Sequence, residues 1–190
     1  MGCKLKVREL LTLIKSDFVR LADFWGKELT FLCGLKMVVL PTMIAIILYR
    51  ISHFFYVNNL RFLSWPIWGL NITLTGTDIH PSSVIGKGFF LGHSVGNIIT
   101  GRLGDNVTCF AKVGIGSGVG DLSKDVGAGP GMPYIKDNVQ IGAGAMILGP
   151  VVIEEFVKVA PSTYLYESVP KGATVHGNPA KISIKKMPTD

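Results

Sequence analysis

Residues 135–165 read IKDNVQ-IGAGAM-ILGPVV-IEEFVK-VAPSTY-L when the chain is divided into units of six. Each unit opens with an aliphatic residue, and a small or β-branched residue stands four positions later in every complete unit. A step of six fits neither the 3.6-residue period of a helix nor the alternation of a long strand. It is typical of a coil of short flat strands and tight turns, in which each hexapeptide forms one face and points its aliphatic residue inward.

The same step organises an earlier segment, from Ile79 to Ile115. Eleven of the thirteen positions in the two runs are Ile, Leu or Val, and the exceptions are Asn97 and Cys109. This agreement argues against ordinary strands that share a phase by chance. We therefore expect a β solenoid whose inward positions are Ile79, Ile85, Leu91, Asn97, Leu103, Cys109, Ile115, Ile135, Ile141, Ile147, Ile153, Val159 and Leu165.

Residues 116–134 interrupt the repeats and are rich in glycine. The step from Ile115 to Ile135 is not a multiple of six, although the same pattern continues on both sides. We expect this segment to be a loop that is extruded from the coil. Long loops on a rigid scaffold commonly carry function.

Composition limits the kinds of partner. The net charge of the 190-residue chain is +6, but no basic cluster is interleaved with aromatic residues, so we expect no nucleic-acid partner. A phosphate-bearing cofactor or a membrane surface suits this charge better. Cys3, Cys33 and Cys109 are scattered, with neither a disulfide framework nor metal-ligand spacing, which indicates a cytoplasmic protein without a metal.

Residues 1–72 are expected to form a helical region, and residues 73–190 the coil with its C-terminal tail. Residues 4–25 have an amphipathic helical pattern. Residues 35–56 are more apolar, and three interpretations stay open for them: a buried helix, a helix on a membrane surface, or a membrane span. Peripheral membrane contact would involve residues 35–70. Asn58-Asn59 and Trp65-Pro66 are turn or boundary signals within this region.

Several motifs of the chain are considered together. They are Tyr49-Arg50-Ile51-Ser52-His53-Phe54, Thr75-Gly76-Thr77-Asp78-Ile79-His80-Pro81, Ile85-Gly86, His93, Ile141-Gly142-Ala143-Gly144-Ala145 and Gly177-Asn178-Pro179-Ala180-Lys181. Together these motifs resemble the serine O-acetyltransferases of bacteria, which are hexapeptide-repeat acyltransferases. The resemblance covers roughly residues 45–182, and it implies a left-handed parallel β-helix of triangular section, a homotrimer, and acetyl-CoA bound in the groove between subunits.

His93 is the candidate general base. A neutral hydroxyl is a poor nucleophile, and a histidine can accept its proton near neutral pH. The family's base aligns with His93, and the carboxylate that orients it aligns with Asp78. The separation of Asp78 from His93 is close to one turn of three hexapeptides, so a side-chain contact between the two is expected.

Further residues are expected at the cofactor. The family's cofactor-binding positions align with Gly116, Ser117 and Ala143, and its phosphate-binding lysine aligns with Lys158. Lys181 is a second candidate for the phosphates.

The chain departs from the family where the acceptor is recognised. Gly92 replaces the aspartate that precedes the base, and Gly131-Met132 replaces the Arg-His at the end of the extruded loop. A zwitterion binds poorly without charged partners. The sequence therefore predicts an acetyl-CoA-dependent O-acetyltransferase whose acceptor is a hydroxyl of a surface glycan. Serine is the close alternative, and a non-catalytic β-helix for assembly or membrane binding is an alternative of another class.

Overall fold

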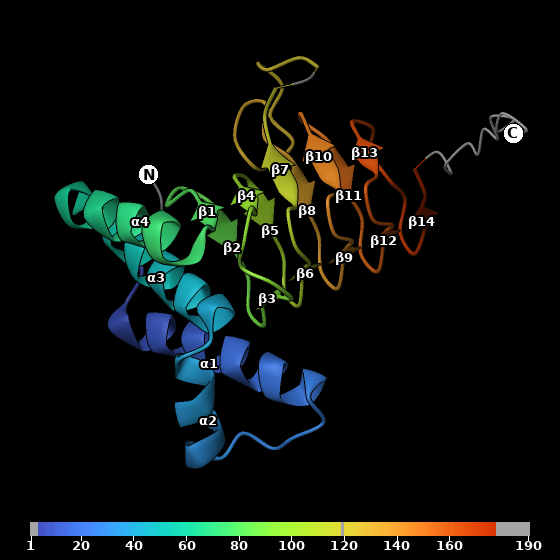
Figure 1. Ribbon diagram of the computed structural model, residues 1–190. Coiled ribbons are helices and arrows are strands. Elements are labelled where there is room, and N and C mark those ends of the chain that lie inside the picture. The colour runs from blue at the N-terminus through green and yellow to red at the C-terminus, as the bar shows by residue number, and fades with distance from the viewer. Residues whose placement is uncertain (1–3, 119, 178–190) are drawn as a thin grey trace, which may run out of the picture.

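The computed structural model describes residues 4–118 and 120–177. Four helices gather at one end of a stack of short strands, and β14 (Thr174–Val175) lies at the other end (Figure 1). The helices are α1 (Val7–Phe24), α2 (Phe31–Val38), α3 (Pro41–Val57) and α4 (Arg61–Thr75). The remaining strands are β1 (Asp78–Ile79), β2 (Val84–Ile85), β3 (Phe90–Leu91), β4 (Ile98–Ile99), β5 (Arg102–Leu103), β6 (Thr108–Cys109), β7 (Gly114–Gly116), β8 (Tyr134–Ile135), β9 (Gln140–Ile141), β10 (Met146–Leu148), β11 (Val152–Ile153), β12 (Lys158–Val159) and β13 (Tyr164–Leu165).

From β1 to β13, successive strands go in turn to three parallel sheets, which form the three faces of the β-helix, and β14 joins the third sheet. Sheet A has the order β1-β4-β7-β10-β13, sheet B has β2-β5-β8-β11, and sheet C has β3-β6-β9-β12-β14. Neighbouring strands within a sheet are mostly one coil of three hexapeptides apart, as in the pairing of Ile85 with Leu103. The expected left-handed β-helix with a helical N-terminal region is confirmed.

The core is a column of aliphatic side chains inside the three sheets. Ile79, Ile135, Ile141, Ile147 and Ile153 are fully buried, as the six-residue pattern predicts. Complete burial of one such side chain stabilises a fold by about 1.5–3 kcal/mol. The small residues four positions later are buried as well, at the corners between faces.

One inward position is predicted wrongly. Asn97 is buried, but it lies in a corner before β4, and Ile99 is the residue that points into the column. The pairing of Asp78 with Ile98 spans a longer stretch of chain than a regular coil, and the pairing of Ile98 with Gly114 spans a shorter one. The corner before β4 is therefore enlarged and the corner after it is reduced.

The reduced corner turns at Gly101, whose φ is 140°. A Cβ at this position would also lie 2.7 Å from the carbonyl oxygen of Pro133. Both the backbone conformation and the available space therefore require glycine.

The glycine-rich segment is a loop that projects from the coil between β7 and β8 (Figure 1). The Asp125 carboxylate closes a turn in it by accepting hydrogen bonds from the backbone N–H groups of Gly127, Ala128 and Gly129 at 2.7–3.1 Å. These hydrogen bonds hold the pKa of Asp125 below its usual value. The coil continues in register beyond the loop, because Leu103 pairs with Ile135.

Two prolines and one glycine lie at the ends of these helices or within them. Pro41 divides the apolar segment, because it occupies the first position of α3 and α2 ends before it. α4 continues past the expected boundary at residue 72 and ends at Gly76, whose φ is 66°. Pro66 lies inside α4 and does not end it. Its missing N–H would have bonded to the carbonyl of Phe62, a residue that is 71% exposed and within reach of water.

α3 is largely buried against its neighbours, including Met43, Ala45 and Ile46. No single helix in the described part of the chain is both long and apolar enough to cross a membrane; α2 and α3 meet that test only as a pair, bent by 87°. The buried face of α3 favours the interpretation of a packing helix. The expected membrane contact of residues 35–70 gains no support from it.

A buried ion pair joins the helices to the first coil. Arg50 donates from Nε and Nη2 to the Asp17 carboxylate at 2.9 and 3.0 Å. It also donates to the carbonyl oxygens of Ile85 and Gly86 at 2.5 and 2.6 Å. Asp17 accepts a further hydrogen bond from the backbone N–H of Phe89 at 2.8 Å. Burial raises the pKa of Asp17, and the Arg50 charge acts against that rise.

We predict that Asp17→Ala lowers the free energy of unfolding by about 3–5 kcal/mol, because it leaves the Arg50 guanidinium buried without its carboxylate. Urea denaturation at one fixed protein concentration measures this loss. Lys171→Ala is the control, because it breaks an exposed ion pair between Lys171 and Glu155. Equal losses in the two variants would contradict a structural role for the buried pair.

Candidate functional site

His93 lies in the corner between β3 and β4, and its side chain is exposed. The Asn97 side chain braces this corner: its amide Nδ2 donates to the carbonyl oxygens of His93 at 2.7 Å and Ser94 at 3.0 Å. Asn97 Oδ1 accepts the backbone N–H of Val113 from the next coil at 3.0 Å. Thr77 Oγ1 also donates to the Ser94 carbonyl oxygen at 2.5 Å. The backbone that carries the imidazole is therefore fixed, while the ring faces solvent.

A pocket of about 320 Å³ opens beside His93. β3 and the His93 corner form one wall, and the end of α1 with the start of α3 forms the other. Leu21, Phe24 and Trp25 face the corner from the end of α1. Apart from His93, the residues that line the pocket carry no titratable side chain. It is therefore an apolar pocket with one group that can move a proton.

Asp78 begins sheet A and is half-buried. Its Oδ1 accepts a hydrogen bond from the indole Nε1–H of Trp68 at 2.9 Å. Asp78 pairs with Ile98, which begins the strand after the His93 corner, so both candidate residues belong to the first coil. Within the described residues of one protomer, no hydrogen bond joins Asp78 to the His93 ring. The expected contact between them therefore stays a prediction.

The cofactor candidates lie along two edges of the coil. We call the corners from sheet C to sheet A the C–A edge, and those from sheet A to sheet B the A–B edge. Ala143 lies on the C–A edge with His93, and Lys158 is close by on β12; both line a groove of about 360 Å³. Gly116 and Ser117 lie on the A–B edge, in a groove of about 270 Å³ that Met132 also lines. Lys181 lies outside the described residues.

Two other histidines are part of the packing. His53 Nδ1 lies 2.8 Å from the carbonyl oxygen of Pro81, and His80 Nδ1 lies 2.6 Å from Ser82 Oγ. Burial lowers the pKa of both rings, which favours their neutral forms. No group of three or more His, Cys, Asp or Glu residues in the described chain is arranged to hold a metal ion.

Comparison with known proteins identifies the family. The serine acetyltransferase of Helicobacter pylori is 30% identical to the chain over 151 residues, which are 78% of the chain and 85% of that protein. The chain belongs to the serine acetyltransferase family. A serine acetyltransferase of Bacillus pumilus is 35% identical over 143 residues, but these are only 63% of that protein, so the chain spans less than two thirds of its length. No protein-family model matches the chain.

Solved structures of serine acetyltransferases have the same fold. The enzyme of Neisseria gonorrhoeae in complex with serine matches with a TM-score of 0.76 and 26% identity, over 92% of this chain and 69% of that one. Isoform 3 from Entamoeba histolytica in complex with cysteine matches with a TM-score of 0.77 and 26% identity, over 94% of this chain and 62% of that one. The shared part includes the helices as well as the coil.

The chain has Gly92 where the serine acetyltransferase pattern has an aspartate, and the structure explains why a glycine is needed here. A Cβ at position 92 would lie 2.7 Å from Cδ1 of Phe110, which stands one coil further along the C–A edge. The phenyl ring occupies the space that a side chain at 92 would need. Phe110 also lines the groove with Ala143 and Lys158, so it separates that groove from the His93 pocket.

Sequence reasoning missed three residues of this site: Asn97, Phe110 and Trp68. Asn97 carried a signal, because it is the one amide among the aliphatic positions of the repeat. Phe110 follows Cys109, which pairs with Leu91 in the preceding coil, so its approach to Gly92 could have been found by aligning successive coils. Trp68 carried no such signal, because its contact with Asp78 depends on how α4 folds back onto β1.

We predict that Gly92→Ala lowers the free energy of unfolding by about 1–3 kcal/mol, because the added methyl group overlaps the Phe110 ring. Thermal or urea unfolding measures the change. Phe110→Ala in the same chain should remove most of the added loss, since the space is then free. Gly116→Ala is the matched control on the coil, because an added Cβ there meets nothing within 4 Å. If Gly92→Ala lowers the free energy of unfolding equally in a Phe110→Ala background, this explanation is contradicted.

Proposed function

We propose that the chain is an acetyl-CoA-dependent O-acetyltransferase and that serine is its acceptor. The observation that carries the proposal is His93: a solvent-facing imidazole on a fixed corner, at the mouth of a pocket otherwise free of titratable groups. Its position in a chain of the serine acetyltransferase family supports the same role. The relatives named above are all serine acetyltransferases, so they favour serine over the glycan acceptor that the sequence predicts.

The proposed chemistry needs one proton to move twice. His93 accepts the proton of the acceptor hydroxyl as its oxygen bonds to the acetyl carbonyl carbon. The bond from that carbon to the thiol sulfur then breaks, and His93 returns the proton to the leaving thiol. The Asp78 carboxylate stabilises the imidazolium between these steps and orients the ring, as carboxylates do beside other histidine bases.

The residues on the coil fit the acetyl donor. Lys158 is exposed on β12 and has no ion-pair partner among the described residues, so its charge is available to phosphates. The small side chain of Ala143 leaves the neighbouring backbone of the C–A edge accessible to a ligand. Gly116 has open space where a side chain would stand, which allows a thioester close to the backbone. The donor is a cytoplasmic metabolite, which agrees with the free thiols of Cys33 and Cys109.

A homotrimer would reconcile the two groups of cofactor residues. Sheet A separates Gly116 and Ser117 on the A–B edge from Ala143 and His93 on the C–A edge. A ligand that runs along one edge of a single protomer would reach only one of the two groups. If the A–B edge of one protomer faces the C–A edge of the next, all four residues border one intersubunit groove. We therefore propose the trimer as the active form.

A neutral glycan hydroxyl is the second candidate acceptor, and one observation favours it. The pocket beside His93 presents Phe24, Trp25 and Val95, and none of the carboxylate or guanidinium groups that would pair with a zwitterion. Aromatic side chains instead suit the apolar face of a sugar ring. Met132, in the place of the family's histidine, extends this apolar character to the A–B groove.

We predict that the purified chain releases CoA thiol from acetyl-CoA when L-serine is present, and that His93→Ala lowers kcat by about 100-fold or more. A thiol reagent follows the release, and mass spectrometry identifies O-acetylserine. His176→Ala is the control, because that exposed histidine follows β14 at the far end of the coil. Undiminished turnover in His93→Ala would remove His93 from the role of base.

A direct competition between acceptors separates the two candidates. With acetyl-CoA fixed, L-serine and a panel of methyl glycosides are compared by kcat/KM. We predict a higher value for serine, as in its family. A glycoside preferred by about tenfold or more, together with a loss of that preference in Trp25→Ala, would reverse the assignment.

A further inference from the structure

The Asp78 carboxylate has one hydrogen bond among the described residues, and it comes from Trp68. The indole Nε1–H donates to Oδ1 at 2.9 Å. We propose that Trp68 is a positioning residue for acetyl transfer: it fixes the Asp78 carboxylate so that the second oxygen is presented to the His93 imidazole. This inference rests on the proposed function, in which Asp78 orients the base.

The indole is itself held in place by its neighbours. Its ring centroid lies 5.3 Å from that of Trp65 and 5.6 Å from that of His80, both in an edge-to-face arrangement. His80 is anchored by Ser82, whose Oγ and backbone N–H both lie within hydrogen-bond distance of Nδ1. Aromatic pairs in this geometry are favourable by about 0.5–1.5 kcal/mol beyond area burial. Trp68 therefore has little freedom to turn away from Asp78.

The helix that carries Trp68 is also fixed relative to the coil. Ser52 Oγ donates to the Ser64 carbonyl oxygen and Ser64 Oγ to the Ser52 carbonyl oxygen, each at 2.9 Å, which sets the register of α4 on α3. One turn after Trp68, the Asn71 amide donates to the carbonyl oxygen of Ala45 at 3.0 Å. The N–H that meets Asp78 is thus part of a rigid assembly of α3, α4 and β1.

An indole suits this task because it is a donor only and carries no charge. It can hold the carboxylate in one orientation without neutralising it, whereas a lysine or arginine would compete with the imidazolium for the same negative charge. A half-exposed aspartate without such a donor samples several rotamers, and orienting it again in each turnover would raise the barrier.

Trp68→Phe tests the inference, since it keeps an aromatic ring and removes the donor. We expect kcat to fall about tenfold, with KM for acetyl-CoA and for serine changed by no more than about twofold. Trp65→Phe is the control for altered ring packing, because it changes the ring that packs on Trp68, while no hydrogen bond of the Trp65 indole is present in the described structure. Incorporation of benzothienylalanine at position 68 replaces the N–H by sulfur with almost the same shape, and it should reproduce the loss if Trp68→Phe unfolds.

A double-mutant cycle distinguishes positioning from packing. In an Asp78→Asn background, loss of the Trp68 donor should have no further effect on kcat, because its target is already changed. An equal loss in both backgrounds would overturn the inference, and so would unimpaired turnover of Trp68→Phe while Asp78→Asn is impaired. Absence of turnover in the unaltered chain would instead overturn the proposed function, and the inference with it.

Discussion

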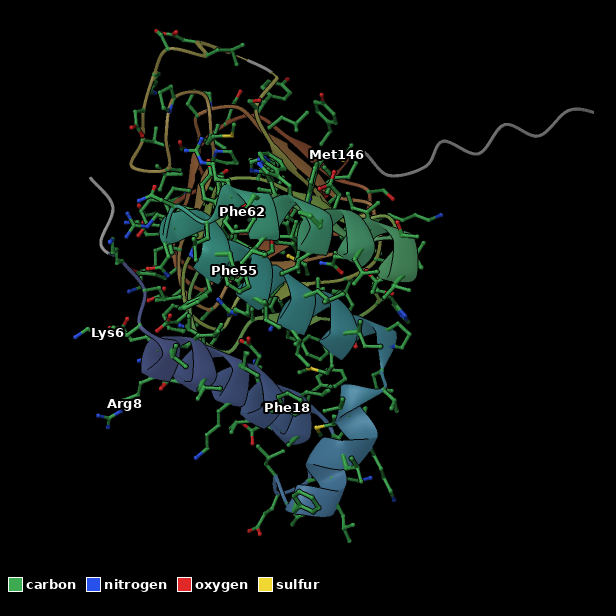
Figure 2. All side chains as sticks on the ribbon, turned by 90° about the vertical axis from the view of Figure 1, so that its left-hand side faces the viewer. Lys6, Arg8, Phe18, Phe55, Phe62 and Met146 are labelled. Carbon is green, nitrogen blue, oxygen red and sulfur yellow. The ribbon has the colours of Figure 1, made fainter. Side chains whose placement is uncertain are left out.

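The guanidinium of Arg50 is the buried charge at the junction of the helices and the coil. It is buried with Asp17 of α1 and bonds to two carbonyl oxygens of the first coil. A buried charge is costly unless it is paired and hydrogen-bonded, so this docking of the helices is the one that satisfies the guanidinium. The pocket beside His93 depends on that docking, because one of its walls is α1 and the other is the coil. Figure 2 shows this arrangement from the helical side: α1 and α2 lie below α3 in this view, with Phe18 near the end of α1.

The six-residue pattern was sufficient to predict a β solenoid, whereas its left-handed triangular form came from the family resemblance. A three-sided column admits one inward side chain per face and coil, so burial repeats the same residue type at a fixed interval. The pattern failed at Asn97 because it registers only which residues are aliphatic. Ile98 and Ile99 both qualify, and nothing in the pattern shows that one corner is enlarged and the next reduced. Helix existence was likewise predictable, whereas the end of α4 was set by Gly76 and the side chains before it.

Only those residues of the candidate site that can be recognised one at a time could be proposed from the sequence. His93 and Lys158 are candidates because they align with the family's general base and phosphate-binding lysine, and their roles stay predictions. The partners of these residues come from other coils or from the helices, and a linear sequence does not show such contacts. Phe110 reaches Gly92 from the next coil, and Trp68 reaches Asp78 by way of a helix turned back on the sheet.

The loop between β7 and β8 has a consequence for engineering. Leu103 pairs with Ile135 across the loop just as Ile85 pairs with Leu103 across a regular coil, although the intervening chain is much longer. The coil thus tolerates a large change in length at this junction, yet a single added residue within a strand would turn its inward side chain outward. The Asp125 turn within the loop closes on itself, and Arg102 of β5 ties it to the coil by donating to the carbonyl oxygen of Gly127 at 3.2 Å. A peptide epitope or fluorophore-labelling sequence inserted into the loop outside this turn would be displayed on the surface, and the coils on either side would assemble as before.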